Sequence, residues 1–357
     1  MSIVALAAAL VFGCVACASA STGNGPCSLF AGPHGNDAAR GTAAAPFRTA
    51  QRLADALRGG QTGCLENGTY TGYLRVTHGG RAGAALTIRS VPGSMATVRG
   101  RVWIRGGSDY VTLSGLRIVG APTPGSCATG QCSNIPTVAV NGRAATLRDD
   151  RITNDHTSIC VAVGSDQWGV ARNTLIARDV IHDCGRLPAT NLEHGIYVAD
   201  AVNTVIRSNY IYDNADRGIQ LYPHARGTTV EENVIEANGE GILIGGVGAN
   251  PTRASVIQHN LITDSRNGGN VESYFPSGPP AALLNQVRDN CLSGGQVNPS
   301  GGGIVGAGLG FFARDNVITP VAKLTAGRPL GDRARHRAQT AIARSRCKAV
   351  FRIPPRD

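Results

Sequence analysis

The chain of 357 residues contains only two lysines, Lys323 and Lys348, and both lie beyond residue 322. Any general base in the preceding part must therefore be a histidine, tyrosine, arginine or carboxylate. Aromatic residues make up only 5% of the chain and charged residues only 16%. So little charge is expected where many positions face an elongated core or a tight turn. Together with 47 glycines, this composition favours one elongated domain over two globular ones.

The sequence also lacks a long apolar segment outside its first twenty residues, so no membrane span is expected. Residues 3–12 form a short apolar core, and residues 18–20 match an A-x-A cleavage signal. We therefore predict that residues 1–20 are a signal peptide and that the protein is secreted. Lipid attachment at Cys14 is a weaker alternative, because it would retain Cys17 as an odd thiol.

The net charge of +10 comes mainly from the end of the chain. Residues 323–357 carry ten Lys or Arg and two Asp, which gives 10 − 2 = +8. The body is close to neutral, and we expect no nucleic-acid partner. The basic tail is interpreted as a solvated extension or a C-terminal cap, with binding to a polyanion or to the cell envelope as the lesser alternative.

A tripeptide of one polar residue, glycine and isoleucine recurs at a fixed step of 23 residues, beginning at positions 194, 217 and 240. Its copies are His194-Gly195-Ile196, Arg217-Gly218-Ile219 and Glu240-Gly241-Ile242. A second triplet, mostly Asn or Asp followed by two residues of which the last is apolar, recurs with variable spacing. Its copies end at Ile152, Ile181, Ile211, Ile235, Ile262, Leu292 and Ile318. Such periods indicate stacked structural units that share a core and differ in their loops.

Short strand-like runs follow each glycine of the first repeat. Alternation at period two places Ile196, Ile219 and Ile242 inside and Tyr197 and Gln220 outside. The coils are too short for strand–helix crossovers, so they favour parallel strands joined by tight turns, about 4.8 Å apart. We expect the repeated Asn and Asp side chains to form an internal ladder that satisfies backbone groups of the turns.

This pattern resembles the pectate-lyase-like group of right-handed parallel β-helix proteins over roughly residues 46–320. The resemblance implies an all-β, single-stranded right-handed parallel β-helix with an N-terminal capping helix. An amphipathic stretch at 50–57, with Leu53 and Leu57 on one face, suits that cap. The expected organisation is a signal peptide (1–20), an N-terminal segment with the capping helix (21–62), the β-helix (63–322) and the basic tail (323–357).

Removal of the signal peptide leaves eight cysteines, an even number that fits an oxidised, exported protein. No C-x-x-C spacing occurs outside the leader, which argues against a metal site built from cysteine. Sequence alone leaves the connectivity open. Our preferred pairs are Cys27–Cys64 across the cap, Cys127–Cys132 within one loop, Cys160–Cys184 on adjacent coils and Cys291–Cys347 at the tail.

The best candidate site lies on three consecutive coils, whose outer face carries polar and aromatic residues. Proposed catalytic residues are Glu193, His194, Asp216, Arg217 and Tyr222. Proposed substrate-binding residues are Tyr197, Gln220, His224 and Glu240. Asp213 and Asp216 are candidate ligands for Ca²⁺, the one cofactor the sequence suggests. A salt-bridged structural ladder of His194, Arg217 and Glu240 is the competing interpretation.

Two segments carry a more specific resemblance. Residues 193–197 (Glu-His-Gly-Ile-Tyr) and 212–219 (Tyr-Asp-Asn-Ala-Asp-Arg-Gly-Ile) are similar to the His-Gly-Ile and Tyr-Asp-Asn segments of mannuronan C5-epimerases. That resemblance implies acid–base chemistry on uronate polymers, with His194 at the groove-lining histidine position. The Asp-Pro-His catalytic motif of that family does not occur in this chain.

The first hypothesis is an enzyme that removes the proton α to a carboxylate in a uronate-containing polysaccharide, by β-elimination or C5 epimerisation. Arg217 would neutralise the carboxylate, and His194, oriented by Glu193 or Asp216, would be the base. Tyr222 or Tyr197 would donate to the leaving oxygen. The expected partner is an extended, acidic polysaccharide bound by a monomer.

Two alternatives remain open. A glycoside hydrolase would need two carboxylates at a defined separation, and Glu240 with Asp216, or Glu193 with Asp213, are the candidates. A non-catalytic carbohydrate-binding or envelope solenoid would use the same outer face without turnover.

Overall fold

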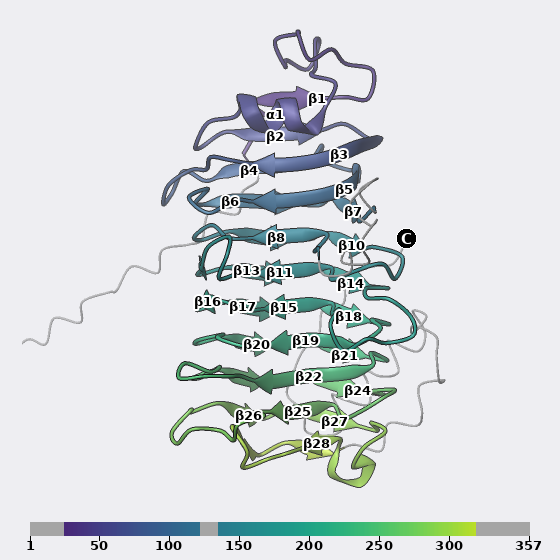
Figure 1. The fold of residues 1–357 in the computed structure, drawn as a ribbon. Coiled ribbons are helices and arrows are strands. Elements are labelled where there is room, and N and C mark those ends of the chain that lie inside the picture. The colour runs from purple at the N-terminus through teal and green to yellow at the C-terminus, as the bar shows by residue number, and fades with distance from the viewer. Residues whose placement is uncertain (1–24, 122–134, 319–357) are drawn as a thin grey trace, which may run out of the picture.

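The computed structural model describes residues 25–121 and 135–318. The predicted signal peptide, the whole predicted tail and Cys127, Cys132 and Cys347 lie outside the described residues. The described chain winds into coils stacked along one axis, from β1 and α1 at one end to β28 at the other (Figure 1). Its strands are parallel throughout the named ladders, as the period of the repeats predicts.

Three columns of strands run the length of the stack. The first column is the eleven-stranded sheet of β1 (Leu29–Ala31), β2 (Thr62–Leu65), β4 (Leu86–Ser90), β6 (Val111–Ser114), β9 (Thr146–Arg148), β13 (Leu175–Ala177), β17 (Val205–Arg207), β20 (Thr229–Glu231), β23 (Val256–Gln258), β26 (Gln286–Arg288) and β29 (Phe312–Arg314). The other two columns share the long strands β3 (Thr69–Val76) and β5 (Thr97–Ile104) and then separate.

The second, called here the β10 column, continues through β7 (Arg117–Val119), β10 (Arg151–Thr153), β14 (Val180–His182), β18 (Tyr210–Tyr212), β21 (Val234–Glu236), β24 (Leu261–Thr263), β27 (Cys291–Ser293) and β30 (Val317–Ile318). The third, the β15 column, continues through β8 (Val138–Val140), β11 (Val161–Val163), β15 (Ile196–Val198), β19 (Arg217–Leu221), β22 (Glu240–Gly245), β25 (Val271–Tyr274) and β28 (Ile304–Val305). The remaining elements are β12 (Ala171–Arg172), β16 (Ala201–Val202), α1 (Ala50–Ala56) and the 3₁₀-helix η2 (Pro299–Gly301).

The register of the β15 column confirms the 23-residue repeat. Tyr197 pairs with Gln220, and Arg217 pairs with Glu240 on the next strand. The alternate residues Ile196 and Ile219 are fully buried in the central core. The triplets are likewise in register along the β10 column. Each coil therefore adds one layer of aliphatic side chains to a continuous core.

The predicted internal ladder is confirmed at the turns that precede the β10 column. The backbone N–H of Asp150 donates to Oδ1 of Asp179 (2.7 Å), and the N–H of Asp179 donates to Oδ1 of Asn209 (2.9 Å). The same bond then recurs on each following coil, through Asn233, Asn260, Asn290 and Asn316. A side chain on one coil thus satisfies a buried backbone donor of the coil before it.

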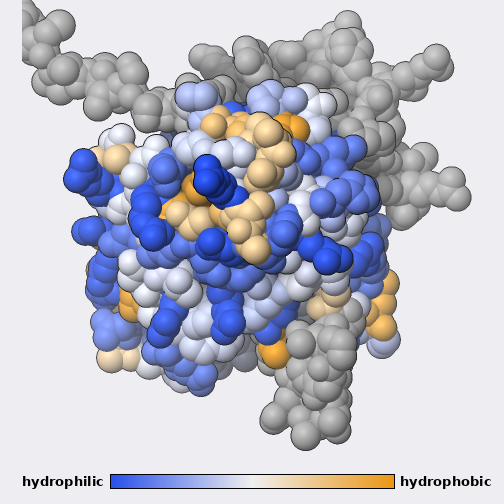
Figure 2. All heavy atoms as spheres, turned by 90° about the horizontal axis from the view of Figure 1, so that it is seen from above, coloured by the Kyte–Doolittle hydropathy of each residue, from blue (hydrophilic) through white to orange (hydrophobic). Residues whose placement is uncertain are grey.

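The predicted capping helix is α1, which covers the N-terminal end of the stack (Figure 1). Leu53 and Leu57 are fully buried, and Thr49 caps the helix by accepting from the backbone N–H of Arg52 (3.1 Å). This end exposes mainly polar residues around a limited apolar strip (Figure 2). The cap shields the apolar core at this end of the stack. The strand β1 precedes it and already pairs with β2.

Two of the preferred disulfides are present, Cys27–Cys64 and Cys160–Cys184. Cys291 is also disulfide-bonded, and its predicted partner lies outside the described residues. Within the described ranges, the search for a helix of membrane-spanning length and apolarity finds none.

Candidate functional site

A groove of about 740 Å³ runs along the outer face of the β15 column. Six predicted site residues line it: His194, Tyr197, Arg217, Gln220, Tyr222 and His224. They come from two consecutive coils, and the groove continues to neighbouring coils on either side, from Ala139 of β8 to Tyr274 of β25. The strand register that brings these side chains together is the one the sequence repeat predicts.

The floor of the groove follows one outward-facing row of the β15 column. In register along this row are Trp103, Ala139, Ala162, Tyr197, Gln220 and Leu243. The two alanines leave a depression, since their side chains end at Cβ while their neighbours in the row are large. Trp168, from the loop after β11, lies over this part, with its ring centre 6.1 Å from that of Trp103.

Aromatic side chains also mark the opposite end of the groove. The rings of Tyr222 and Tyr274 lie 6.1 Å apart, and Gly245 occupies the position that pairs with Tyr274 between them. A Cβ atom at Gly245 would clash with the backbone oxygen of Tyr274 and lie 3.2 Å from Cδ2 of Tyr222, so glycine is needed for the close approach of the Tyr274 backbone. Trp168 and Tyr274 remain 43% and 51% exposed, so both present their rings to solvent and to a ligand.

His194 sits at the wall of the groove and is only 2% exposed. Its ring meets the Tyr197 ring edge-on at 5.5 Å. Nδ1 is buried and has no hydrogen-bond partner among the described residues, so Nε2 is the nitrogen available to a ligand. Burial, aided by the nearby Arg217 cation, holds the pKa of His194 well below its usual range. The imidazole is therefore neutral at neutral pH.

Arg217 forms the predicted in-register pair with Glu240. Its Nε donates to Oε2 (2.7 Å) and its Nη2 to Oε1 (3.2 Å), a bidentate contact. Nη1 donates to the carbonyl of Asn191 (3.1 Å) and to Oε1 of Gln220 (3.4 Å). Burial raises the pKa of Glu240 although Arg217 opposes this. The Arg217–Glu240 step of the predicted salt-bridged ladder is therefore present, while Nδ1 of His194 takes no part in it, and the arginine also faces the groove.

Four predicted site residues lie away from the groove lining: Glu193, Asp216, Glu240 and Asp213. Glu193 is fully buried and accepts from the backbone N–H (2.6 Å) and Nε (3.0 Å) of Arg186. Asp216 is buried, and its Oδ2 accepts from the N–H of Glu193 (2.7 Å). No hydrogen bond joins either carboxylate to His194 Nδ1, so neither orients that ring. Their expected orienting role does not fit, because these carboxylates instead hold the loop before His194. Glu240 is also outside the lining and acts through Arg217.

Asp213 and Asp216 do not form a shared calcium site in this arrangement. Asp213 pairs with Arg266, and Asp216 bonds the backbone of the neighbouring coil. The group that Asp213 does join contains His156 and Asp183. His224 lines the groove with its Nδ1–H donated to the carbonyl of Asn250 (2.8 Å).

Sequence reasoning missed Asp166, Trp168, Asp200 and Tyr274, all of which line the groove. They lie in loops, at strand ends or on coils outside the strict 23-residue step, so no spacing argument aligned them with His194. The available signal for these groove residues was that Asp166 and Trp168 stand two positions apart in one short loop. Burial raises the pKa of Tyr197 to about 12, with further contributions from Tyr222, Asp200 and Asp166. Its phenol is therefore a hydrogen-bond donor at neutral pH.

Comparison with known proteins defines the class. Residues 101–275 match the family model for the right handed beta helix region. Together with the parallel three-column stack, this match makes the chain a right-handed parallel β-helix protein. No curated protein sequence matches it.

Solved structures of similar fold have low sequence identity. The structure of XylC with xylose has a TM-score of 0.60 at 12% identity and covers 81% of this chain and 68% of that one. Pectate lyase Pel9A has a TM-score of 0.58 at 13% identity and covers 94% and 92%. An alginate lyase from Paenibacillus sp. str. FPU-7 has a TM-score of 0.56 at 18% identity and covers 78% and 94%. These likenesses establish the fold.

Proposed function

We propose that the protein is an exported, carbohydrate-active β-helix protein that holds an extended polysaccharide in the groove of the β15 column. The observation that carries this proposal is the row of aromatic side chains along the groove, interleaved with polar groups. Trp168, Tyr197, Tyr222 and Tyr274 offer faces on which sugar rings stack, and Gln220 and Asp200 offer hydrogen bonds to hydroxyls. The similar fold of a pectate lyase and an alginate lyase supports the same substrate class.

The reaction we favour is abstraction of the proton α to the carboxylate of a uronate unit, leading to β-elimination or C5 epimerisation. His194 is the proposed base, since its imidazole is neutral and its Nε2 is the nitrogen open to the groove. A substrate carboxylate placed beside it favours the imidazolium and so raises its pKa during the reaction. Tyr197 or Tyr222, both of which line the groove, would donate to the leaving oxygen.

Arg217 is the proposed partner of the substrate carboxylate, and in the free protein it is paired with the carboxylate of Glu240. The bidentate pair offsets the guanidinium charge in the free protein. The contacts of Arg217 with Glu240, with the carbonyl of Asn191 and with Gln220 hold the guanidinium in place at the groove.

A second candidate reaction is glycoside hydrolysis. Among the described residues, Asp166 and Asp200 are the carboxylates that line the groove. Two carboxylates flanking a bound sugar are what hydrolysis requires. The pairs expected from sequence, Glu240 with Asp216 and Glu193 with Asp213, do not line it. If hydrolysis occurs, Asp166 and Asp200 are the residues to test.

The test is to incubate the mature protein with a panel of uronate polymers, with and without Ca²⁺, and follow ultraviolet absorbance and reducing ends. Elimination raises both, because it leaves a conjugated double bond, while hydrolysis raises reducing ends alone. We expect His194→Ala to lower the rate at least about 100-fold, the scale of one general base. His259→Ala, outside the groove, is the matched control. If His194→Ala turns over normally and Asp200→Asn loses activity, the proposal of elimination is wrong and hydrolysis takes its place.

A further inference from the structure

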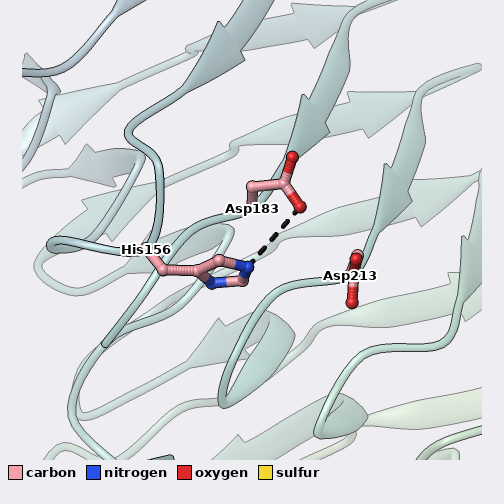
Figure 3. A group of neighbouring side chains, drawn as sticks. All are labelled: His156, Asp183 and Asp213. Carbon is pink, nitrogen blue, oxygen red and sulfur yellow. Dashed lines mark ion pairs between the residues drawn. The ribbon is translucent and has the colours of Figure 1, made fainter. Parts of the chain in front are cut away.

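A group of three side chains outside the groove has the composition and geometry of a metal centre. His156, Asp183 and Asp213 follow the ends of β10, β14 and β18, so one comes from each of three consecutive coils. One ligand atom from each lies within 4.8 Å of the other two. Figure 3 shows the three side chains facing a common space between the coils. None of them lines the groove.

The separation of the nearest two ligand atoms already matches shared coordination. His156 Nε2 lies 3.5 Å from Oδ1 of Asp183. Two ligands bound at about 2.0 Å with a tetrahedral angle lie about 3.3 Å apart. Only a small adjustment is therefore needed for both atoms to bind one ion.

Each of the three ligands is fixed by a neighbour through its other polar atom. The Nδ1–H of His156 donates to the carbonyl of Gly185 (3.0 Å), which leaves the Nε2 lone pair for a metal. The second oxygen of Asp183, Oδ2, accepts from Nδ1–H of His182 (2.7 Å). Oδ1 of Asp213 accepts from Arg266, which leaves its Oδ2 to bind. Ligands oriented in this way by outer partners are typical of protein metal sites.

The backbone around the group is also held in place. The N–H of His156 donates to the carbonyl of Asp183 (2.7 Å), which joins two of the ligand turns directly. The next residue after Asp183 is Cys184, which is bonded to Cys160. A preformed, cross-linked site loses little conformational freedom when it binds an ion.

We propose that His156 Nε2, Asp183 Oδ1 and Asp213 Oδ2 bind one divalent transition-metal ion, with the remaining coordination positions open to water. The imidazole nitrogen favours a borderline ion such as Zn²⁺ over Ca²⁺ or Mg²⁺, which prefer all-oxygen sites. The site ties three coils together at the base of the 185–192 segment, of which Asn191 and Leu192 reach the groove. This inference is independent of the reaction proposed for the groove.

The test is calorimetric titration of the tag-free mature protein with ZnCl₂, and separately with CaCl₂. We expect one Zn²⁺ per chain and weaker or no binding of Ca²⁺ at this site. His156→Asn and Asp183→Asn remove a ligand and should each weaken binding by more than about 100-fold. His182→Gln, which removes the hydrogen bond to Asp183 together with the ring stacked on Tyr212, should weaken it roughly 10- to 100-fold.

Asparagine is chosen because it tolerates the positive φ of His156 (58°) and Asp183 (53°), so the variants keep the turn. Circular dichroism checks that they fold. His259→Asn, at a turn residue with φ 55° that is outside the group, is the matched control and should bind as the unaltered protein does. Equal Zn²⁺ affinity in His156→Asn, absence of a one-to-one Zn²⁺ site, or preference for Ca²⁺ would overturn the proposal.

Discussion

At the scale of single residues, two aspartates occupy positions that the rest of the ladder gives to asparagine. Oδ2 of Asp150 and Oδ2 of Asp179 are buried without a hydrogen-bond partner among the described residues. The equivalent Nδ2 of Asn209 instead donates to the carbonyl of Ile176 (3.0 Å). Burial raises the pKa of Asp150 to about 8, with a further contribution from the Asp149 charge. Burial also raises the pKa of Asp179 well above its usual range, with a further contribution from Asp150.

We therefore predict that Asp150→Asn stabilises the protein at neutral pH. The unfolded state releases the proton above about pH 4, while the folded state keeps it up to about pH 8. Folding then takes up a proton, so stability falls as pH rises between these values, by at most roughly 1.4 kcal/mol per pH unit. The variant should gain about 1–3 kcal/mol at pH 7 and little at pH 4, as measured by urea unfolding.

Asn209→Asp is the reverse exchange at the next ladder position but one and should destabilise the protein at pH 7. A stability difference between Asp150→Asn and the unaltered protein that does not change from pH 4 to pH 7 would contradict the protonated ladder.

At the scale of elements, the Cys160–Cys184 disulfide joins the coil of β11 to the turn after β14. It closes a loop with a sequence separation of 24 residues. Loss of both thiols in Cys160→Ala/Cys184→Ala should lower the free energy of unfolding by about 2–4 kcal/mol, because the unfolded chain gains freedom. Denaturant unfolding measures this, with Cys27–Cys64 left intact. A change under about 0.5 kcal/mol would show that the neighbouring coils already fix the loop.

The sequence predicted those elements whose pattern is local. The 23-residue step gave the pairing of Tyr197 with Gln220, and the amphipathic stretch at 50–57 gave α1. It could not align the coils of Ala139 and Ala162 with them, because the insertions between coils differ in length and register is set by three-dimensional stacking. The sequence also predicted Glu193 as a catalytic residue, whereas in the structure this carboxylate is buried and bound to Arg186 in its own loop.

At the scale of the whole molecule, the solenoid separates stability from ligand binding. Its interior is a continuous aliphatic core with internal ladders, while the outer face of the β15 column is free to vary from coil to coil. One part of that face is a groove with alanines at its floor and aromatic rings at both ends. We propose that this face holds an extended ligand across several coils, and that its outward residues set what is recognised.

The most direct measurement of this central claim is a tryptophan fluorescence titration with oligouronates and neutral oligosaccharides. The chain has two tryptophans: Trp168 lines the groove, and its ring centre lies 6.1 Å from that of Trp103. We predict a saturable change with at least one acidic glycan and its loss in Ala162→Arg, which fills the floor. The control is Val170→Arg, at an exposed residue outside the groove lining. Saturable binding that persists unchanged in Ala162→Arg, or no response to any glycan tested, would contradict the assignment of this groove as a polysaccharide site.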